Sequence, residues 1–305
     1  MVAREYKDQH FIPAGYLRAW CDPDAPANHE PYVWLFDRDS RTGCKKAPRN
    51  IFSERDFYTE IDATGQRDLA LEHFLNRLET RFADVRRKTI DPRSPVTASA
   101  RSLLCYFCAA MNARTRAMRE HVRSQWSPIL KHGEELEAWA RTAPPEQLQS
   151  ARSFLSSALG SASISIDDVR RIVKSPAQTA VRNFIGNEGQ MYASMDLSIL
   201  YTDDPIGFIT SDQPCVWFDP ALDDAPCAWR SPGLDSPTIE VLLPLSPSCL
   251  LFFNRLGLKG YIPATSVVVR KTNRMVRFGA DRAYVVRRNH SDEYWFASNP
   301  EAQPQ

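Results

Sequence analysis

The spacing of apolar residues changes along the chain, and this change constrains the fold more than any other feature of the sequence. In the middle, Leu71, Leu75, Leu78, Phe82 and Val85 recur at three- and four-residue intervals, the period of one face of an α-helix. Toward both ends, short runs rich in β-branched and aromatic residues alternate with Pro, Asp and Gly, as is typical of strands and turns. The sequence therefore predicts an α+β fold, with a helical central region flanked by N- and C-terminal strands.

The expected helices begin and end at prolines and capping residues. A short helical turn should follow Pro13, with Phe11, Tyr16, Leu17 and Trp20 against the core. Longer helices are expected over residues 68–88, 96–126, 134–141, 145–159, 176–193 and 263–278, and another should open at the cap Ser165–Asp168. The sequence DPRSP separates the first two of the longer helices, because proline cannot continue a helix.

The strands fall into two groups that we expect to join in one mainly antiparallel sheet. The N-terminal strand is predicted at 32–37, and the C-terminal ones at 197–202, 207–211, 215–218, 238–245, 249–253 and 283–288. Residues 1–305 are interpreted as a single α+β domain. The alternative is a helical subdomain, 66–195, within a β-containing core formed by 1–65 and 196–290.

Composition excludes several classes of protein. The longest apolar run, 103–111, is far shorter than the roughly 18 residues of a membrane span, so we expect no membrane association. The seven cysteines have no regular spacing, which favours reduced thiols and a cytoplasmic location. Cys105 and Cys108 form a CxxC within an apolar helical stretch, where core packing is the expected role.

Charge is segregated along the chain, although the formal net charge is only +1. Basic residues dominate 77–123 and 255–288, whereas acids dominate 203–240. This pattern can create a basic face that meets a nucleic acid or another phosphate-bearing substrate. The alternative is that the basic and acidic segments neutralise each other within the fold.

Six motifs, in order, carry a resemblance to a known family: QHFIPAGYLRAW, NIF...DFY, ALEHFLNRLETRFADVRRK, FITSDQP, LPLSP and TNRMVRFGADRAYV. Over residues 9–287 the chain resembles the family of proteins of unknown function numbered 4238. The resemblance implies a bacterial group without an established activity. One departure is the Ala-Trp that ends the first motif, where the family more often has Asn-Phe. The positions that match the family's pattern are Gln9, His10, Pro13, Tyr16, Leu17, Asn50, Tyr58, Glu72, Glu79, Ser211, Asp212, Pro214, Pro244, Ser246 and Asn273.

Three residues are candidates for catalysis: His10, Asp212 and Glu72. As a histidine, His10 could act as an acid, a base, a metal ligand or a hydrogen-bond donor to a phosphate. The alternative is that it only holds the following helix in place. Asp212 ends a predicted strand, where it could bind a metal, orient His10 or act as a base; the alternative is that it bonds its own turn. Glu72 and Glu79 share a helix face about 10 Å apart, so pairing with Arg114 or Arg119 on the next helix is the leading alternative.

The candidate substrate-binding residues match the family's pattern or lie on the basic helices: Gln9, Tyr16, Asn50, Tyr58, Arg114 and Ser211. Arg116 and His121 form an RxxxxH like that of certain ribonucleases, although such spacing is common on solvated helices. RNFIGNEG, at 182–189, contains two glycines within a helical pattern and is interpreted as packing or a local kink. Motifs for common cofactors are missing, so no cofactor is evident, and a divalent metal remains an open expectation.

Two function classes follow from these patterns, with a third in reserve. The first is a hydrolase acting on nucleic acid or another phosphate-bearing substrate, with His10 and Asp212 as its polar centre. The alternative is a non-catalytic binding or regulatory module of a bacterial stress or phage-defence system, in which those residues serve the fold and an exposed apolar patch is the notable surface. An enzyme of specialised metabolism is the third. The sequence gives no expectation for the oligomeric state.

Overall fold

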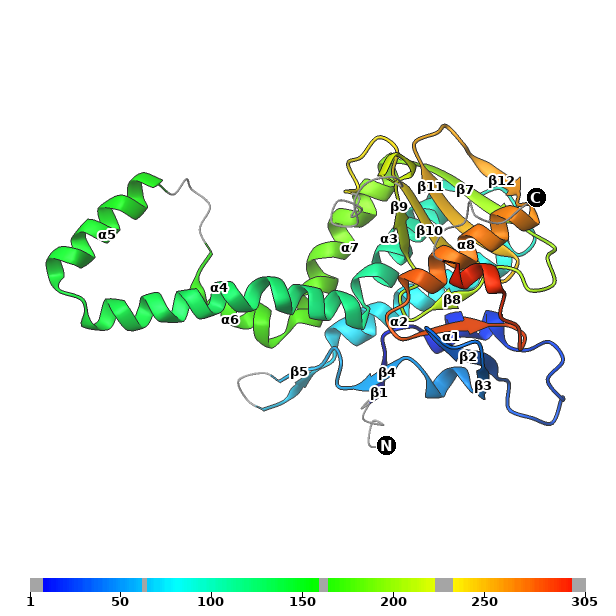
Figure 1. Ribbon diagram of the computed structural model, residues 1–305, viewed down its shortest axis with the longest axis horizontal. Helices are drawn as coiled ribbons and strands as arrows, with labels where there is room; N and C mark the ends of the chain where they lie inside the picture. Colours follow the sequence, from blue (N-terminus) through cyan, green and yellow to red (C-terminus); the bar gives the residue numbers. More distant parts are fainter. Residues whose placement is uncertain (1–7, 62–64, 159–163, 223–232, 298–305) are drawn as a thin grey trace.

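A computed structural model describes residues 8–61, 65–158, 164–222 and 233–297 of the chain (Figure 1). Cys227 lies outside the described residues. Strands from both ends of the chain and the helices of its middle build the body, and one long helical arm extends from it. The mixture of helices and antiparallel sheets confirms the predicted α+β class.

The larger sheet contains five strands in the order β12-β7-β11-β10-β9. Neighbours are antiparallel except at one edge, where β12 runs parallel to β7, a pairing that the sequence did not indicate. Nearly every residue of the two central strands is buried, which accounts for their continuous apolar runs. The bounds are β7 Asp196–Tyr201, β9 Val216–Phe218, β10 Glu240–Ser246, β11 Cys249–Asn254 and β12 Gly260–Pro263.

The second sheet joins the two ends of the chain in the order β3-β2-β13-β8, with antiparallel neighbours. This pairing confirms that N-terminal strands meet C-terminal ones, but the expectation of one sheet is wrong, because the C-terminal strands divide between two sheets. Helix α8, Ser266–Gly279, packs against β8, β9 and β13. The bounds are β2 Val33–Asp37, β3 Gly43–Lys46, β8 Thr210–Ser211 and β13 Ala283–Val286, and two small pairs are β1 Asp8–His10 with β4 Ser53–Arg55, and β5 Glu60–Ile61 with β6 Arg67–Asp68.

Three helices cover the larger sheet: α2, Ala70–Val85; α3, Ala98–Ala113; and α7, Pro176–Ser194. Helix α3 is buried between the other two and the strands. Helix α1, Ala14–Leu17, follows Pro13 as predicted, and α6, Ile166–Lys174, begins at the predicted Ser165 cap. Short helical turns cover Arg18–Trp20, Pro48–Asn50, Arg86–Ile90, Pro220–Leu222 and Glu293–Phe296.

The prediction of a single helix over 96–126 is wrong, because the helix is interrupted at Arg114. Helix α3 ends there, and Thr115 caps a new helix, α4, Arg116–Thr142, by accepting a hydrogen bond from the backbone N–H of Met118. Helix α4 passes through Pro128 and includes the segment predicted as a separate helix at 134–141. Helix α5, Pro145–Ala158, follows it.

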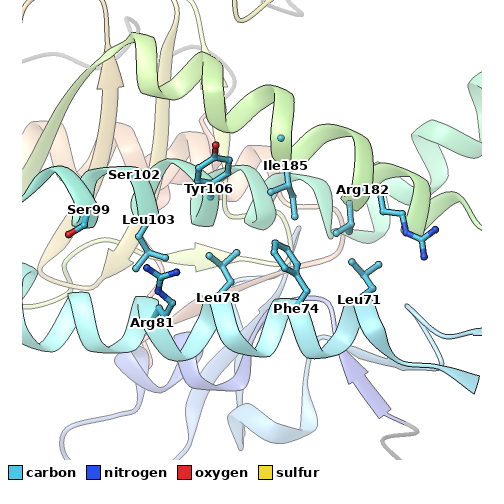
Figure 2. Close-up of a pocket in the computed structure, with 12 residues that line it drawn as sticks. Leu71, Phe74, Leu78, Arg81, Ser99, Ser102, Leu103, Tyr106, Arg182 and Ile185 are labelled. Atoms are coloured by element: carbon cyan, nitrogen blue, oxygen red, sulfur yellow. The ribbon is translucent and has the colours of Figure 1, made fainter.

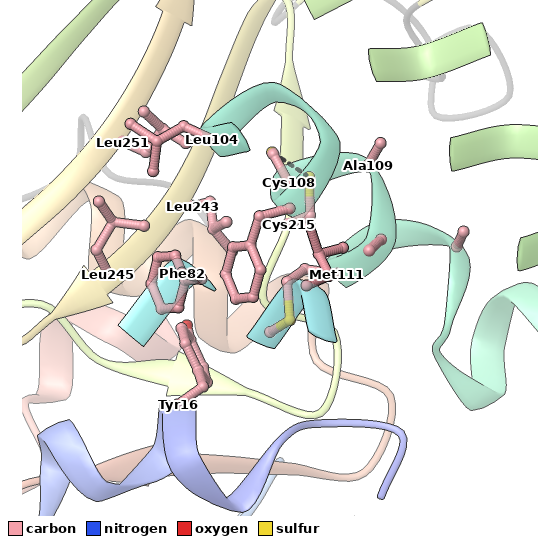
Figure 3. Close-up of a cluster of buried hydrophobic side chains, with 14 of the residues drawn as sticks. Tyr16, Phe82, Leu104, Cys108, Ala109, Met111, Cys215, Leu243, Leu245 and Leu251 are labelled. Atoms are coloured by element: carbon pink, nitrogen blue, oxygen red, sulfur yellow. Dashed lines mark hydrogen bonds between the residues drawn. The ribbon is translucent and has the colours of Figure 1, made fainter. Parts of the chain in front are cut away.

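The main apolar core lies between the larger sheet and helices α2 and α3 (Figure 3). The rings of Phe82 and Phe107 stack with their centroids 3.7 Å apart and their planes inclined by 2°. Tyr16 closes the core from the N-terminal side, while Leu243 and Leu251 close it from the sheet. One cluster thus contains residues from the N-terminal segment, the helices and the C-terminal strands. Whether 66–195 behaves as a separate subdomain stays a prediction.

Candidate functional site

His10 ends strand β1, where its side chain is partly exposed. Its Nε2 atom lies 3.1 Å from the carbonyl oxygen of Arg49, so an N–H there donates to that oxygen. Burial lowers the pKa of His10, which favours the neutral ring at physiological pH. The charged groups that act on this ring are Arg114, Glu79 and Asp8. His10 therefore belongs to a polar cluster at the junction of the N-terminal motif with helices α2 and α3.

Arg114 is the centre of that cluster and is almost completely buried. Its Nη1 lies 2.6 Å from Oε1 of Glu79, and its Nη2 donates to the backbone oxygen of His10 at 2.6 Å. Its Nε donates to the hydroxyl of Tyr58 at 3.2 Å, and that hydroxyl donates to the backbone oxygen of Arg114 at 3.0 Å. Because all three guanidinium nitrogens are engaged, Arg114 acts as a brace, and the predicted pairing with Glu79 is confirmed.

Glu72 lies on α2 two turns before Glu79 and is also buried. The amide of Asn76 is 3.5 Å from its Oε1, while Oε2 is buried without a hydrogen-bond partner among the described residues. Burial raises the pKa of Glu72, only partly offset by the positive charge of Arg114. Glu72 is thus the member of the cluster with a carboxylate oxygen that accepts no hydrogen bond from the described residues.

Three of the predicted substrate-binding residues are internal parts of the fold. The amide of Gln9 accepts from the backbone N–H of Tyr58 at 2.6 Å and donates to the hydroxyl of Thr59 at 2.9 Å. The hydroxyl of Tyr16 donates to the backbone oxygen of Pro244 at 2.6 Å. These three side chains are fully buried and bonded, whereas Asn50 is exposed.

Asp212 belongs to a different part of the molecule. Its two carboxylate oxygens accept three backbone N–H groups, from Asp281, Arg282 and Ala283, at 2.8 to 3.1 Å. Burial raises the pKa of Asp212, and these three donors partly counteract the increase. The hydroxyl of Ser211 accepts from the backbone N–H two residues later. Asp212 holds the turn that leads from α8 into β13, and Ser211 holds the turn that follows β8, so the structure does not bring Asp212 to His10.

The other expected groups have structural partners as well. Arg116 and Arg119 both contact the carboxylate of Glu54, and Arg119 also lies over the ring of Phe57. Cys105 and Cys108 are buried in α3, as expected for core packing. Among the described residues, no three His, Cys, Asp or Glu side chains gather where they could hold a metal ion.

A cavity of about 690 Å³ lies between α2, α3 and α7 (Figure 2). Its floor is apolar, and the partly exposed rings of Phe74 and Tyr106 form its rim. We call it the helix groove, and its lining residues are Leu71, Phe74, Leu78, Arg81, Ser99, Ser102, Leu103, Tyr106, Val181, Arg182, Ile185 and Gly186.

Two glycines of α7 shape the helix groove. A Cβ at Gly189 would lie 2.6 Å from the ring of Tyr106, so only glycine lets this ring pack against α7. A Cβ at Gly186 would meet nothing within 4 Å, because that position faces open space beside the groove. The glycines of RNFIGNEG, expected to serve packing or a kink, were the sequence signal for this groove. The exposed aromatic Phe74 beside the apolar stripe of α2 was another.

Arginines stand at opposite ends of the helix groove (Figure 2). Arg182 lies 3.4 Å from the carboxylate of Glu60, in a pair that is largely exposed. Arg81 has no ion-pair partner in the part of the chain that the structure describes. An apolar groove with an unpaired arginine at one end matches a molecule with an apolar body and an anionic group.

A family model described as a protein of unknown function, DUF4238, matches residues 8–291. The chain belongs to this family. The match covers nearly the whole chain, from strand β1 to beyond β13, and so includes both the polar cluster and the helix groove. No curated protein and no solved structure matches this chain. The described residues contain no helix long and apolar enough to cross a membrane.

Proposed function

We propose that the protein is a non-catalytic binding module that holds an amphipathic anion, such as a medium-length acyl chain with a carboxylate, in the helix groove. The observation that carries this proposal is the groove itself, an apolar cavity of about 690 Å³ with an arginine at each end. Ligand sites in proteins usually span roughly 300–1,000 Å³ and combine apolar walls with a few polar groups. The groove has this size and this composition.

The dimensions of α2 indicate how long the ligand is. From Leu71 to Arg81 the helix rises about 15 Å, at roughly 1.5 Å per residue. An extended chain of that length can lie over Leu71, Phe74 and Leu78 with its anionic end at Arg81. Gln9, a candidate for substrate binding, and His10, a candidate for catalysis, bond Tyr58 and Arg114, and Arg114 in turn pairs with Glu79 of α2.

Gly186 offers a sharp test of this site. Replacing it with leucine places a side chain in open space next to the groove and removes a helix-interior glycine, which should stabilise α7 by about 1 kcal/mol. We expect wild type to bind dansyl-undecanoic acid with increased dansyl fluorescence, Gly186→Leu to lose that binding, and Gly186→Ala to keep most of it. Binding unchanged in Gly186→Leu, or no binding by wild type, would contradict the proposal.

The charge at Arg81 can be tested separately. We expect Arg81→Gln to weaken binding of the carboxylate probe roughly threefold to tenfold, as an exposed ion pair contributes about 1 kcal/mol. The methyl ester of the same probe should bind both proteins equally, because it lacks the anionic group. If acid and ester bind wild type equally well, the groove recognises an apolar body alone, and the anionic part of the proposal fails.

A hydrolase acting on nucleic acid or another phosphate-bearing substrate is the second candidate, favoured by Glu72. A buried carboxylate with a raised pKa and a free oxygen, near the positive charge of Arg114, is a group suited to proton transfer. Cleavage of RNA or DNA in the presence of Mg²⁺ or Mn²⁺ should then be lost in both Glu72→Gln and His10→Ala. Intact substrates after incubation with wild type would remove this candidate.

The biological setting stays a prediction. A cytoplasmic module of a bacterial stress or phage-defence system would use the helix groove to sense a small molecule. Growth of cells that express wild type or Gly186→Leu, with and without phage challenge, would test that setting.

A further inference from the structure

Three hydrogen-bond donors that line the helix groove gather at one of its ends (Figure 2). Arg81 lies near the end of α2 and rises from it toward α3, and Ser99 and Ser102 lie in the first two turns of α3. The two serines are three residues apart, so they share one side of their helix, the side that also presents Leu103 to the groove. We call Arg81, Ser99 and Ser102 the head site.

The side chains of the head site have bonding capacity to spare. Arg81 is exposed, and neither its guanidinium nor the hydroxyl of Ser102 has a partner among the described residues. The hydroxyl of Ser99 lies 3.1 Å from that of Thr97 and has no other side-chain contact in the described part of the chain. The lining of the groove includes no Asp or Glu among the described residues. An anion at the head site therefore meets donors without a competing carboxylate.

At the opposite end of the groove, the positive charge is balanced. Arg182 lies 3.4 Å from the carboxylate of Glu60, and its side chain points away from the floor of the groove (Figure 2). Leu71, Phe74 and Ile185 supply apolar surface between that end and the head site. The groove is thus polarised, and an amphipathic anion fits it in one direction, with its charged group at the head site.

A carboxylate does not use all the donors of the head site. It has two oxygens and a single charge, and the planar guanidinium of Arg81 can bind both oxygens by itself. A phosphate monoester has three terminal oxygens and carries roughly 1.5 to 2 negative charges at pH 7. Two of these oxygens can bind Arg81 while the third accepts from Ser99 and Ser102 on the facing helix. The donor set is therefore better matched to a phosphate than to a carboxylate.

We infer that the ligand of the helix groove is a medium-length alkyl chain that ends in a phosphate monoester. The phosphate lies at the head site, and the chain runs over Phe74 toward Leu71. This inference rests on the proposed function, because it assigns the charged group and the direction of the ligand in that same groove. Arg81 binds either kind of anion, whereas Ser99 and Ser102 distinguish a phosphate from a carboxylate.

Displacement of dansyl-undecanoic acid from the full chain tests this assignment. Decyl phosphate and undecanoate present the same length of alkyl chain and differ in the charged group. We expect decyl phosphate to displace the probe from wild type at roughly tenfold lower concentration than undecanoate, because the phosphate makes additional hydrogen bonds to the two serines. Both competitors are used below the concentrations at which they form micelles.

Removing the two hydroxyls tests the role of the serines. Ser99→Ala combined with Ser102→Ala should reduce the preference for decyl phosphate to less than about threefold and leave displacement by undecanoate within about twofold of wild type. Ser124→Ala combined with Ser127→Ala removes two hydroxyls at the same spacing from α4, outside the groove, and should keep the wild-type preference. Alanine favours a helix more than serine does, so both double variants should fold.

The outcomes separate this inference from the proposed function. If decyl phosphate displaces the probe no better than undecanoate, or if its advantage survives in the Ser99→Ala and Ser102→Ala double variant, the inference is overturned. The proposed function then stands, because the groove still binds an amphipathic anion. If wild type binds neither dansyl-undecanoic acid, by fluorescence, nor decyl phosphate, by calorimetry, both are overturned.

Discussion

Nη1 of Arg114 lies 2.6 Å from Oε1 of Glu79, and this ion pair fastens the end of α3 to the middle of α2. The same guanidinium donates hydrogen bonds to the backbone oxygen of His10 and to the hydroxyl of Tyr58. Burial alone would lower the pKa of Arg114, but the neighbouring Tyr58 and Glu79 raise it above its ordinary value. The N-terminal motif is therefore held in place by a charge that belongs to the helical region.

Removing the guanidinium of Arg114 should destabilise the protein more than removing an exposed guanidinium. We expect Arg114→Met to lower the free energy of unfolding by about 3–5 kcal/mol, because it leaves buried partners unpaired. Arg123→Met, which breaks the exposed pair with Glu120, should cost less than about 1 kcal/mol. Denaturant titration measures both. A loss of under about 1 kcal/mol in Arg114→Met would show that the cluster is not a brace.

We expect the ionisation of buried Glu188 to lower the stability of the fold as the pH rises. Its oxygens accept from Asn112 and Tyr192, and burial raises the pKa of Glu188 from 4.5 to about 7. The folded state then binds more protons than the unfolded state between these values, so its contribution is complete below pH 4.5 and is lost as pH rises through about 7. At pH 8 the ionisation of Glu188 lowers the free energy of unfolding by at most about 3 kcal/mol.

Glu188→Gln keeps an acceptor for Asn112 and cannot ionise. We expect this variant to match wild type near pH 4.5 and to exceed its thermal stability at pH 8, with a flatter stability curve between. Thermal unfolding across that range measures the difference. Parallel curves for the two proteins would mean that Glu188 titrates near its ordinary pKa in the fold.

Asp212 should prove to be a structural residue. Asp212→Asn replaces one acceptor oxygen with an N–H donor that faces the backbone N–H groups of 281–283, so we expect a loss of about 1–3 kcal/mol. Asp281→Asn, at an exposed neighbouring position, should change stability by less than about 0.5 kcal/mol. Equal stability of Asp212→Asn and wild type would reopen a role for this carboxylate outside the turn.

The sequence predicted those parts of the fold that depend on local pattern. The stripe of α2, the Ser165 cap and the strands β2 and β13 all follow from spacing or capping chemistry within a few residues. The break at Arg114 was missed because Thr115 continues the helical spacing from Met111 to Met118, and a threonine in such a stripe can lie inside a helix or cap one. The helix groove arises only where α2, α3 and α7 meet.

The first motif illustrates the same limit for the candidate site. His10 and Gln9 were selected because of residue type and family pattern, and both types serve catalysis and structure equally well. The contacts of Gln9 with Tyr58 and Thr59 decide its role, and they join segments about 50 positions apart. Arg81, at one end of the groove, carries no chemical signature that the sequence alone reveals, and the glycines of RNFIGNEG indicated only packing or a kink.

The break between α3 and α4 yields the last prediction. The hydroxyl of Thr115 accepts from the N–H of Met118, and this bond starts the arm. Thr115→Ala should therefore lower the free energy of unfolding by about 1–2 kcal/mol, while Thr115→Ser keeps the cap and loses only a buried methyl. The difference between the two variants in denaturant titration isolates the hydroxyl. If serine and alanine destabilise equally, packing around Thr115, and not the cap, sets the point where α4 begins.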